Sequence, residues 1–111
     1  GFKRVVNIVE DEVDKGTAVG RVDQELLEEP QEETLWNAYR DAEAEIDRAL
    51  GERDWKSACE ALISLKSPID DFFDNVMVNA DDPDLRANRL ALLDELRHLF
   101  LRVADISLVS E

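Results

Sequence analysis

Apolar residues recur along most of the chain at intervals of three and four positions, the spacing that places them on one face of an α-helix. The pattern is continuous from Pro30 to Leu50, where it predicts the longest helix of the first half, and Gly51 stands where a C-terminal cap belongs. A shorter apolar face near the N-terminus predicts another helix. The apolar positions of these two segments are Phe2, Val5, Val6, Ile8, Val9, Leu35, Trp36, Tyr39, Ala42, Ile46, Ala49 and Leu50.

Three further helices are predicted in the second half, each introduced by residues that cap or begin a helix. Asp54 can accept hydrogen bonds from the first free amides of one helix. Ser67 and Pro68 are suited to begin the next helix, and Asp82 and Pro83 the last. The apolar faces of the three are Trp55, Ala58, Cys59, Leu62 and Ile63; Ile69, Phe72, Phe73, Val76, Met77 and Ala80; and Leu85, Leu92, Leu93, Leu96, Leu99, Phe100 and Val103.

These segments predict an all-α fold, an antiparallel bundle of about five helices. Residues 11–21, which include Gly16 and Gly20, lack a helical period and are predicted to be a loop. We expect Trp36 and Trp55 to anchor the core. A chain of 111 residues is the size of one ordinary domain, so residues 1–111 are taken as a single unit.

Composition agrees with a compact helical domain but adds a difficulty. The chain is 44% hydrophobic and 36% charged, and its formal net charge is −14. Such acidity opposes nucleic-acid binding, because contacts to phosphate need lysine and arginine side chains. The single cysteine cannot form an internal disulfide, and no apolar stretch approaches the length that crosses a bilayer, so we expect a cytoplasmic chain with no membrane partner.

Side chains that could carry catalysis are sparse. Glu95 and His98 have the spacing of a di-iron motif, but that centre needs the pair twice, and the chain has one histidine. A metal-dependent enzyme is therefore the weakest alternative, and we assign no metal site. Cys59 lies on an apolar helix face and is interpreted as buried packing. Since no phosphate-binding loop or nucleophile motif is present, we expect no catalytic residue in this chain.

The last predicted helix carries three arginines near one edge. At 100° per residue, Arg86 and Arg97 lie about 20° apart, and Arg89 lies about 60° to the other side. Arg89 therefore projects toward the apolar face, where a guanidinium needs a carboxylate partner. We predict that Arg89 forms a structural ion pair with a carboxylate, for which Asp74 is the candidate.

Two long blocks of sequence resemble a known family. They are Pro68-Ile-Asp-Asp-Phe-Phe-Asp-Asn-Val-Met-Val-Asn79 and Asp82-Pro-Asp-Leu-Arg-Ala-Asn-Arg-Leu-Ala-Leu-Leu93. Both are similar to the C-terminal anticodon-binding domain of bacterial glycyl-tRNA synthetase beta subunits. The resemblance extends through Asp54-Trp55 to Phe2-Lys-Arg-Val-Val-Asn-Ile8, and forward to Phe100-Leu-Arg-Val-Ala-Asp-Ile-Ser107. It therefore covers nearly the whole chain.

The resemblance implies a function that composition does not reveal. The family belongs to the helical bundles named after an Asp-Ala-Leu-Arg (DALR) signature. The complete enzyme joins glycine to tRNA-Gly with ATP; the alpha subunit holds the adenylation site, and the beta subunit supplies tRNA contacts. This chain is then expected to be a non-catalytic, anticodon-binding part of glycine-tRNA ligase, cut from the C-terminus of the beta subunit, without a cofactor of its own.

Several polar residues match the family's motifs and are expected to contact RNA. The first motif is Lys-Arg-x-x-Asn near the N-terminus, and the second is Arg-x-Asn-Arg in the last helix. Side-chain amides can read unpaired bases while cations meet the flanking phosphates. The resemblance implies RNA contacts from Lys3, Arg4, Asn7, Arg86 and Asn88.

The net charge of −14 motivates a rival hypothesis. The acidic helices could instead dock on the alpha subunit or on other synthetase domains, as a structural or protein-interaction domain without direct RNA readout.

Overall fold

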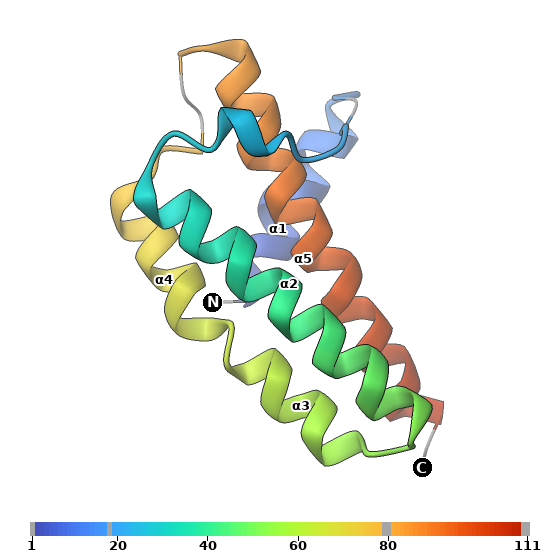
Figure 1. Ribbon diagram of the computed structural model, residues 1–111. Coiled ribbons are helices and arrows are strands. Elements are labelled where there is room, and N and C mark those ends of the chain that lie inside the picture. Colours follow the sequence, from blue (N-terminus) through green and yellow to red (C-terminus); the bar gives the residue numbers. More distant parts are fainter. Residues whose placement is uncertain (1, 18, 79–80, 110–111) are drawn as a thin grey trace.

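The computed structural model describes the backbone of residues 2–17, 19–78 and 81–109, and the side chains of residues 3–17, 19–78 and 81–103. Within these ranges the chain forms helices and no strand, which confirms the all-α prediction (Figure 1). None of these helices is long and apolar enough to span a membrane. The elements are α1 (Phe2–Asp14), the 3-10 helix η1 (Gln24–Leu26), α2 (Pro30–Gly51), α3 (Trp55–Ile63), α4 (Lys66–Asn75) and α5 (Pro83–Val109).

Helix α2 occupies the centre of the arrangement and contacts α3, α4 and α5. After α2 the chain reverses, and α3 and α4 together run back alongside it (Figure 1). Helix α5 then returns in the direction of α2, and α1 packs against α5. The segment between α1 and α2, which contains η1, crosses over the beginning of α5.

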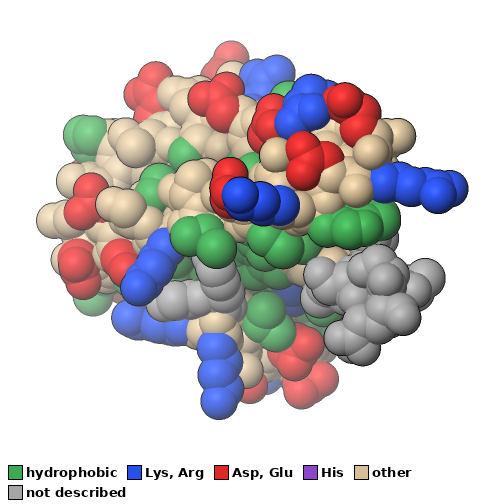
Figure 2. Space-filling model, turned by 90° about the horizontal axis from the view of Figure 1, so that it is seen from below, with side chains coloured by type: hydrophobic (Ala, Val, Ile, Leu, Met, Phe, Trp, Pro, Cys, Tyr) green, Lys and Arg blue, Asp and Glu red, His purple; other side chains and the backbone are tan. Residues whose placement is uncertain are grey.

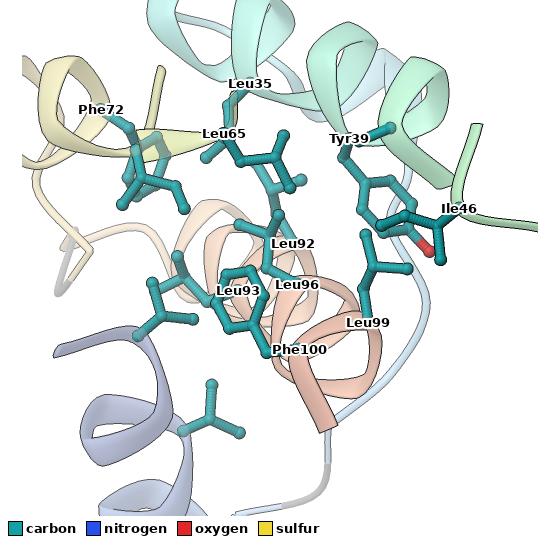
Figure 3. Close-up of a cluster of buried hydrophobic side chains, with 14 of the residues drawn as sticks. Leu35, Tyr39, Ile46, Leu65, Phe72, Leu92, Leu93, Leu96, Leu99 and Phe100 are labelled. Carbon is teal, nitrogen blue, oxygen red and sulfur yellow. The ribbon is translucent and has the colours of Figure 1, made fainter. Parts of the chain in front are cut away.

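The core forms where the apolar faces of these helices meet (Figure 3). The predicted face of α5 is confirmed from Leu92 to Val103, since its apolar members are at most 7% exposed. Aliphatic and aromatic side chains from the other helices interdigitate with this face, as the helical spacing requires. The largest fully buried apolar side chains are Phe72, Leu35, Ile46, Leu65, Ile69, Leu92, Leu93, Leu96 and Leu99.

Two helices end at places that differ from the prediction. Helix α1 continues through Asp14, beyond the expected start of a loop at Asp11. It ends where Gly16 takes a φ of 86°, a left-handed conformation that glycine adopts without steric cost. Helix α2 includes Gly51, and Arg53, with a φ of 57°, is the left-handed residue of that turn. The glycine cap was therefore predicted at the wrong residue.

The start of α3 agrees with the prediction, whereas both ends of α4 differ from it. Asp54 caps α3 as predicted, because its side chain accepts a hydrogen bond of 3.1 Å from the Ser57 amide. Helix α4 begins at Lys66, two residues before the predicted first helical position at Pro68, and its N-cap is Leu65 in place of the predicted Ser67. It ends at Asn75, since Val76 is extended, whereas the predicted apolar stripe continued to Ala80, which lies outside the described residues.

Several apolar residues assigned to the core are exposed. Trp55 is 36% exposed, Ile63 61% and Met77 75%, so these three predictions were wrong. Trp55 begins α3 and Ile63 ends it, where fewer neighbouring helices cover a side chain. Trp36 is half-buried and stacks on Tyr39, with ring centroids 5.6 Å apart.

A buried ion pair joins α2 to α5. Glu32 is fully buried and Arg89 is 6% exposed, and Arg89 Nε donates a hydrogen bond to Glu32 Oε1. The predicted partner, Asp74, was wrong: it is exposed, while Glu32 is the carboxylate that the packing of α2 brings to Arg89. Arg89 Nη1 also donates a hydrogen bond of 2.7 Å to the carbonyl of Met77.

The second carboxylate oxygen of Glu32 is also occupied. Its Oε2 accepts hydrogen bonds from the amides of Glu28 and Glu29, at 2.6 and 2.9 Å. The pair therefore ties together the segment before α2, helix α5 and the connection between α4 and α5. Because every part of this carboxylate has a donor, its burial is tolerated.

A second polar contact between α2 and α5 involves Tyr39, which is 5% exposed. Its hydroxyl lies 2.6 Å from Oε2 of Glu43 and 2.9 Å from Oε2 of Glu95, so two carboxylates share one donated proton. Burial, followed by these hydrogen bonds and the two negative charges, raises the pKa of the Tyr39 phenol above its usual range.

Replacing Arg89 by methionine should lower the free energy of unfolding by about 3–5 kcal/mol, because the Glu32 carboxylate would remain buried without its cation. Urea denaturation followed by circular dichroism would measure the loss. Asp47→Asn is the matched control, since Asp47 pairs with Arg102 on the surface and both are exposed; it should cost about 0–1 kcal/mol. Equal costs for the two variants would contradict the role given to the buried pair.

Replacing Tyr39 by phenylalanine should cost about 1.5–3 kcal/mol at neutral pH, because two carboxylates lose their donor. The raised pKa keeps this contribution intact below the ordinary phenol pKa of 10.0 and lets it fade as the pH rises through the folded value. Unfolding measured from pH 7 to 11 should therefore show a constant difference from the parent protein up to about pH 10, and a shrinking one above it. A difference that grows with pH would refute this account.

Candidate nucleic-acid interface

A groove runs between α1 and the connection from α4 to α5. It consists of two adjoining hollows of about 370 and 420 Å³ that share Glu12, Lys15 and Val78 as lining residues. We call it the α1 groove. Its remaining lining residues are Arg4, Ile8, Asp11, Phe73, Val76 and Met77 in the larger hollow, and Thr17, Pro83, Arg86, Ala87 and Leu90 in the smaller.

The groove brings together two arginines that the sequence predicts from separate motifs. Arg4 is exposed on α1, and its guanidinium lies over the Phe73 ring, 4.3 Å from the centroid. Arg86 is exposed in the first turn of α5, where its amide donates to the carbonyl of Asp82. Asp82 also accepts a hydrogen bond of 2.9 Å from the amide of Asp84, so it starts α5 as predicted. The local start of α5 thus places Arg86 at the end of the groove away from Arg4.

Neither arginine is neutralised inside the described part of the chain. Ion pairs there occupy Arg48, Arg89, Arg97 and Arg102, but no carboxylate lies within ion-pair distance of Arg4 or Arg86. In a chain with 27 acidic and 13 basic residues, such unpaired cations are available for an external anion. On the face drawn in Figure 2, lysine and arginine side chains are spread over the surface together with acidic ones, while hydrophobic side chains gather in a band across its middle.

Two lining residues were missed in the sequence. Lys15 falls in the segment predicted as a loop, yet its amide donates a hydrogen bond to the carbonyl of Asp11 at the end of α1. Its Nζ lies 3.7 Å from Oε1 of Glu12. Phe73 was assigned to the core stripe, although it is only half-buried and supports Arg4. Its aromatic character was visible in the sequence, but its arginine neighbour lies on another helix.

The other two residues expected on α1 lie outside the groove. Lys3 and Asn7 are exposed, and neither lines one of the two hollows. They are one helical turn apart and share a face, whereas Arg4 is turned about 100° from Lys3. The groove therefore uses one member of the N-terminal motif.

Asn88, expected to contact RNA, has a structural role instead. It is 4% exposed, and its side-chain amide forms two hydrogen bonds with the backbone of Asp23: Nδ2 donates to the carbonyl at 3.0 Å, and Oδ1 accepts from the amide at 2.6 Å. This arrangement fastens the segment between α1 and α2 to α5. Because its donor and acceptor are both engaged and buried, the structure does not support the RNA contact expected at Asn88.

The residues considered for a metal site have other partners. Glu95 accepts the hydroxyl of Tyr39, and His98 is exposed with its Nε2 3.7 Å from Asp94. No group of three or more potential metal ligands occurs in the described part of the chain. Cys59, predicted to be buried packing, is half-buried against the core.

Comparison with known proteins supplies a family for this arrangement. Residues 1–106 match the family model described as the DALR anticodon binding domain. The chain is 43% identical over 107 residues to the glycine–tRNA ligase beta subunit of Haemophilus influenzae (strain ATCC 51907 / DSM 11121 / KW20 / Rd), a match that covers 96% of this chain and 15% of that protein.

Two further relatives carry the same name and show the same coverage. The beta subunit of Actinobacillus pleuropneumoniae serotype 7 (strain AP76) is 44% identical over 107 residues, and that of Marinobacter nauticus (strain ATCC 700491 / DSM 11845 / VT8) is 46% identical over 108. Each match covers 96% of this chain and 15% of the relative. These findings confirm the resemblance predicted from the sequence. The chain spans only a small part of these relatives.

Replacing Asn88 by alanine should release Asp23 from α5. The amide hydrogen of Asp23 should then exchange with solvent faster, and unfolding should become easier by about 1–3 kcal/mol because backbone polar groups lose their partners. Hydrogen exchange followed by NMR would measure the first effect. Asn37→Ala, at an exposed position of α2, is the control and should leave both quantities nearly unchanged. Unchanged Asp23 exchange in Asn88→Ala would contradict the fastening role.

Proposed function

The chain belongs to the DALR anticodon binding domain family, and from that membership we propose that it contacts the anticodon region of tRNA-Gly as part of a glycine–tRNA ligase. The similar beta subunits support the choice of ligase, although this chain spans only about 15% of their length. In this proposal the chain has no catalytic residue and no cofactor of its own. The complete enzyme uses ATP to charge tRNA-Gly with glycine in the cytoplasm.

The observation that carries the proposal is the pair of unpaired arginines in the α1 groove. Single-stranded RNA presents phosphates that need cations and bases that need planar or apolar surfaces. The groove offers both, since Arg4 and Arg86 line its two hollows and apolar side chains such as Val78 lie between them. The chemistry of the groove therefore suits an unpaired segment of an RNA loop better than a double helix.

The net charge of −14 limits how the chain can bind. Long-range attraction to RNA is opposed by the field of the protein itself, so the contacts must act at short range. In our proposal the remaining beta-subunit domains and the alpha subunit hold the rest of the tRNA. The chain then meets the anticodon loop at a high effective concentration, which compensates for weak intrinsic affinity.

Replacing Arg4 or Arg86 by alanine in the complete ligase should weaken tRNA-Gly binding about 3- to 10-fold for each variant, as expected for loss of an exposed ionic contact. The slope of log affinity against log salt should also fall in magnitude by about 0.7–1 per arginine. In aminoacylation assays the KM for tRNA should rise, while the KM values for ATP and glycine should stay unchanged. Fluorescence anisotropy over a salt series would measure the binding.

Lys56→Ala is the matched control, because Lys56 is an exposed cation on α3 that does not line the α1 groove. It removes the same charge and should leave affinity and salt slope nearly unchanged. If Arg4→Ala, Arg86→Ala and Lys56→Ala had equal effects, the two arginines would act only through the net charge of the chain and not through a specific contact. If tRNA affinity survives deletion of the chain while subunit assembly fails, the domain is a docking module and the proposed function is wrong.

A further inference from the structure

We propose that Arg4 and Phe73 together form a platform on which one unpaired RNA base stacks in the larger hollow of the α1 groove. This inference rests on the proposed function and deepens it. Bases of single-stranded RNA stack on aromatic rings and on guanidinium planes. The two side chains already form such a layered surface, with the guanidinium of Arg4 4.3 Å from the centroid of the Phe73 ring.

The platform is held from the core side. Phe73 packs edge-to-face against Phe72, with ring centroids 5.7 Å apart and an interplanar angle of 71°. Phe72 is fully buried, so it fixes the plane of Phe73, which in turn orients the guanidinium. Arg4 is itself exposed and has no carboxylate partner in the described chain. Phe73 therefore lies against the guanidinium, and the exposed side of Arg4 can receive a flat ligand.

The hollow beside this platform fits a base better than a phosphate. Its volume of about 420 Å³ falls within the range of small-molecule sites, about 300–1,000 Å³. Asp11 and Glu12 also line it, and their negative charges offset the positive charges of Arg4 and Lys15, so the hollow offers a phosphate little net attraction. A neutral base can instead direct its amino or imino hydrogens toward these carboxylates.

Another lining residue of the hollow is apolar and adaptable. Met77 lines it and is 75% exposed, so its flexible thioether can cover the outer face of a bound base. The carbonyl of Met77 is held by Arg89 at 2.7 Å, which fixes the backbone while leaving the side chain free. One flanking phosphate would then lie toward the other hollow, near Arg86.

Arg4→Lys tests stacking separately from charge, because lysine keeps the positive charge but has no plane. If Arg4 stacks a base, Arg4→Lys should lose about as much tRNA-Gly affinity as Arg4→Ala, about 3- to 10-fold, while keeping the salt slope of the parent enzyme. Phe73→Leu, which keeps apolar packing, should cause a similar loss. The measurements use the complete ligase and anisotropy of labelled tRNA-Gly transcripts.

Abasic transcripts identify the stacked base. One abasic position in the anticodon loop should weaken binding to the parent enzyme and have little further effect on Arg4→Lys, because the same interaction is removed twice. Should Phe73→Leu lower thermal stability, Arg4→Lys alone decides, since Arg4 is exposed.

The outcomes separate the two proposals. Full affinity in Arg4→Lys together with a loss in Arg4→Ala would overturn the platform and keep a phosphate contact. Additive losses between Arg4→Lys and every abasic position would also overturn it. Unchanged binding in Arg4→Ala and Arg86→Ala would overturn the proposed function itself. Coupling between Arg4→Lys and one abasic position supports both.

Discussion

The buried pair of Glu32 and Arg89 fixes the relation between parts of this chain that lie far apart in sequence. A charged pair is stable in a core only when each group keeps good hydrogen-bonding partners. Glu32 meets that requirement with two backbone amides before α2, and Arg89 with the carbonyl of Met77. The pair therefore determines more than the contact of α2 with α5, because it also holds the backbone at Met77, just after α4.

Val76, Met77 and Val78, which follow α4, line the α1 groove. The shape of the groove therefore depends on the buried contact between Arg89 and the carbonyl of Met77. Val76 leaves the helical conformation and is buried, while Met77 turns its side chain outward into the hollow. On the other side, Asn88 fastens the segment around Asp23 to α5, one residue before Arg89. Two adjacent residues of one helix thus hold two connecting segments in place, and neither is free to meet a ligand. A family motif can therefore contain residues that shape a binding surface without touching what binds there.

The acidity of the chain limits what its unpaired cations can do. Most cations with a defined contact are engaged by carboxylates, as in the surface pairs of Arg48 and Arg102. Arg4 instead stacks on an aromatic ring, and Arg86 stands at the start of α5 without a partner in the described chain. A negative surface disfavours loose association with nucleic acid, so binding through this groove would depend on geometry rather than on attraction at a distance. Contacts of that kind favour selectivity over affinity.

The sequence by itself determined the helices, the apolar face of α5, the caps at Asp54 and Asp82, and the family. It also pointed to Arg4 and Arg86, which the structure brings to one groove. Those features depend on residues within a few positions of one another, where helical geometry fixes the spacing. The tertiary structure alone decided the partner of Arg89, the burial of Asn88, the end of α4, and the roles of Phe73 and Lys15. Arg89 and Glu32 are 57 positions apart, and Asn88 and Asp23 are 65, so only the packing of helices could select these contacts. The pattern of one helix shows which of its side chains face inward, but it does not show which residue from another part of the chain each of them contacts.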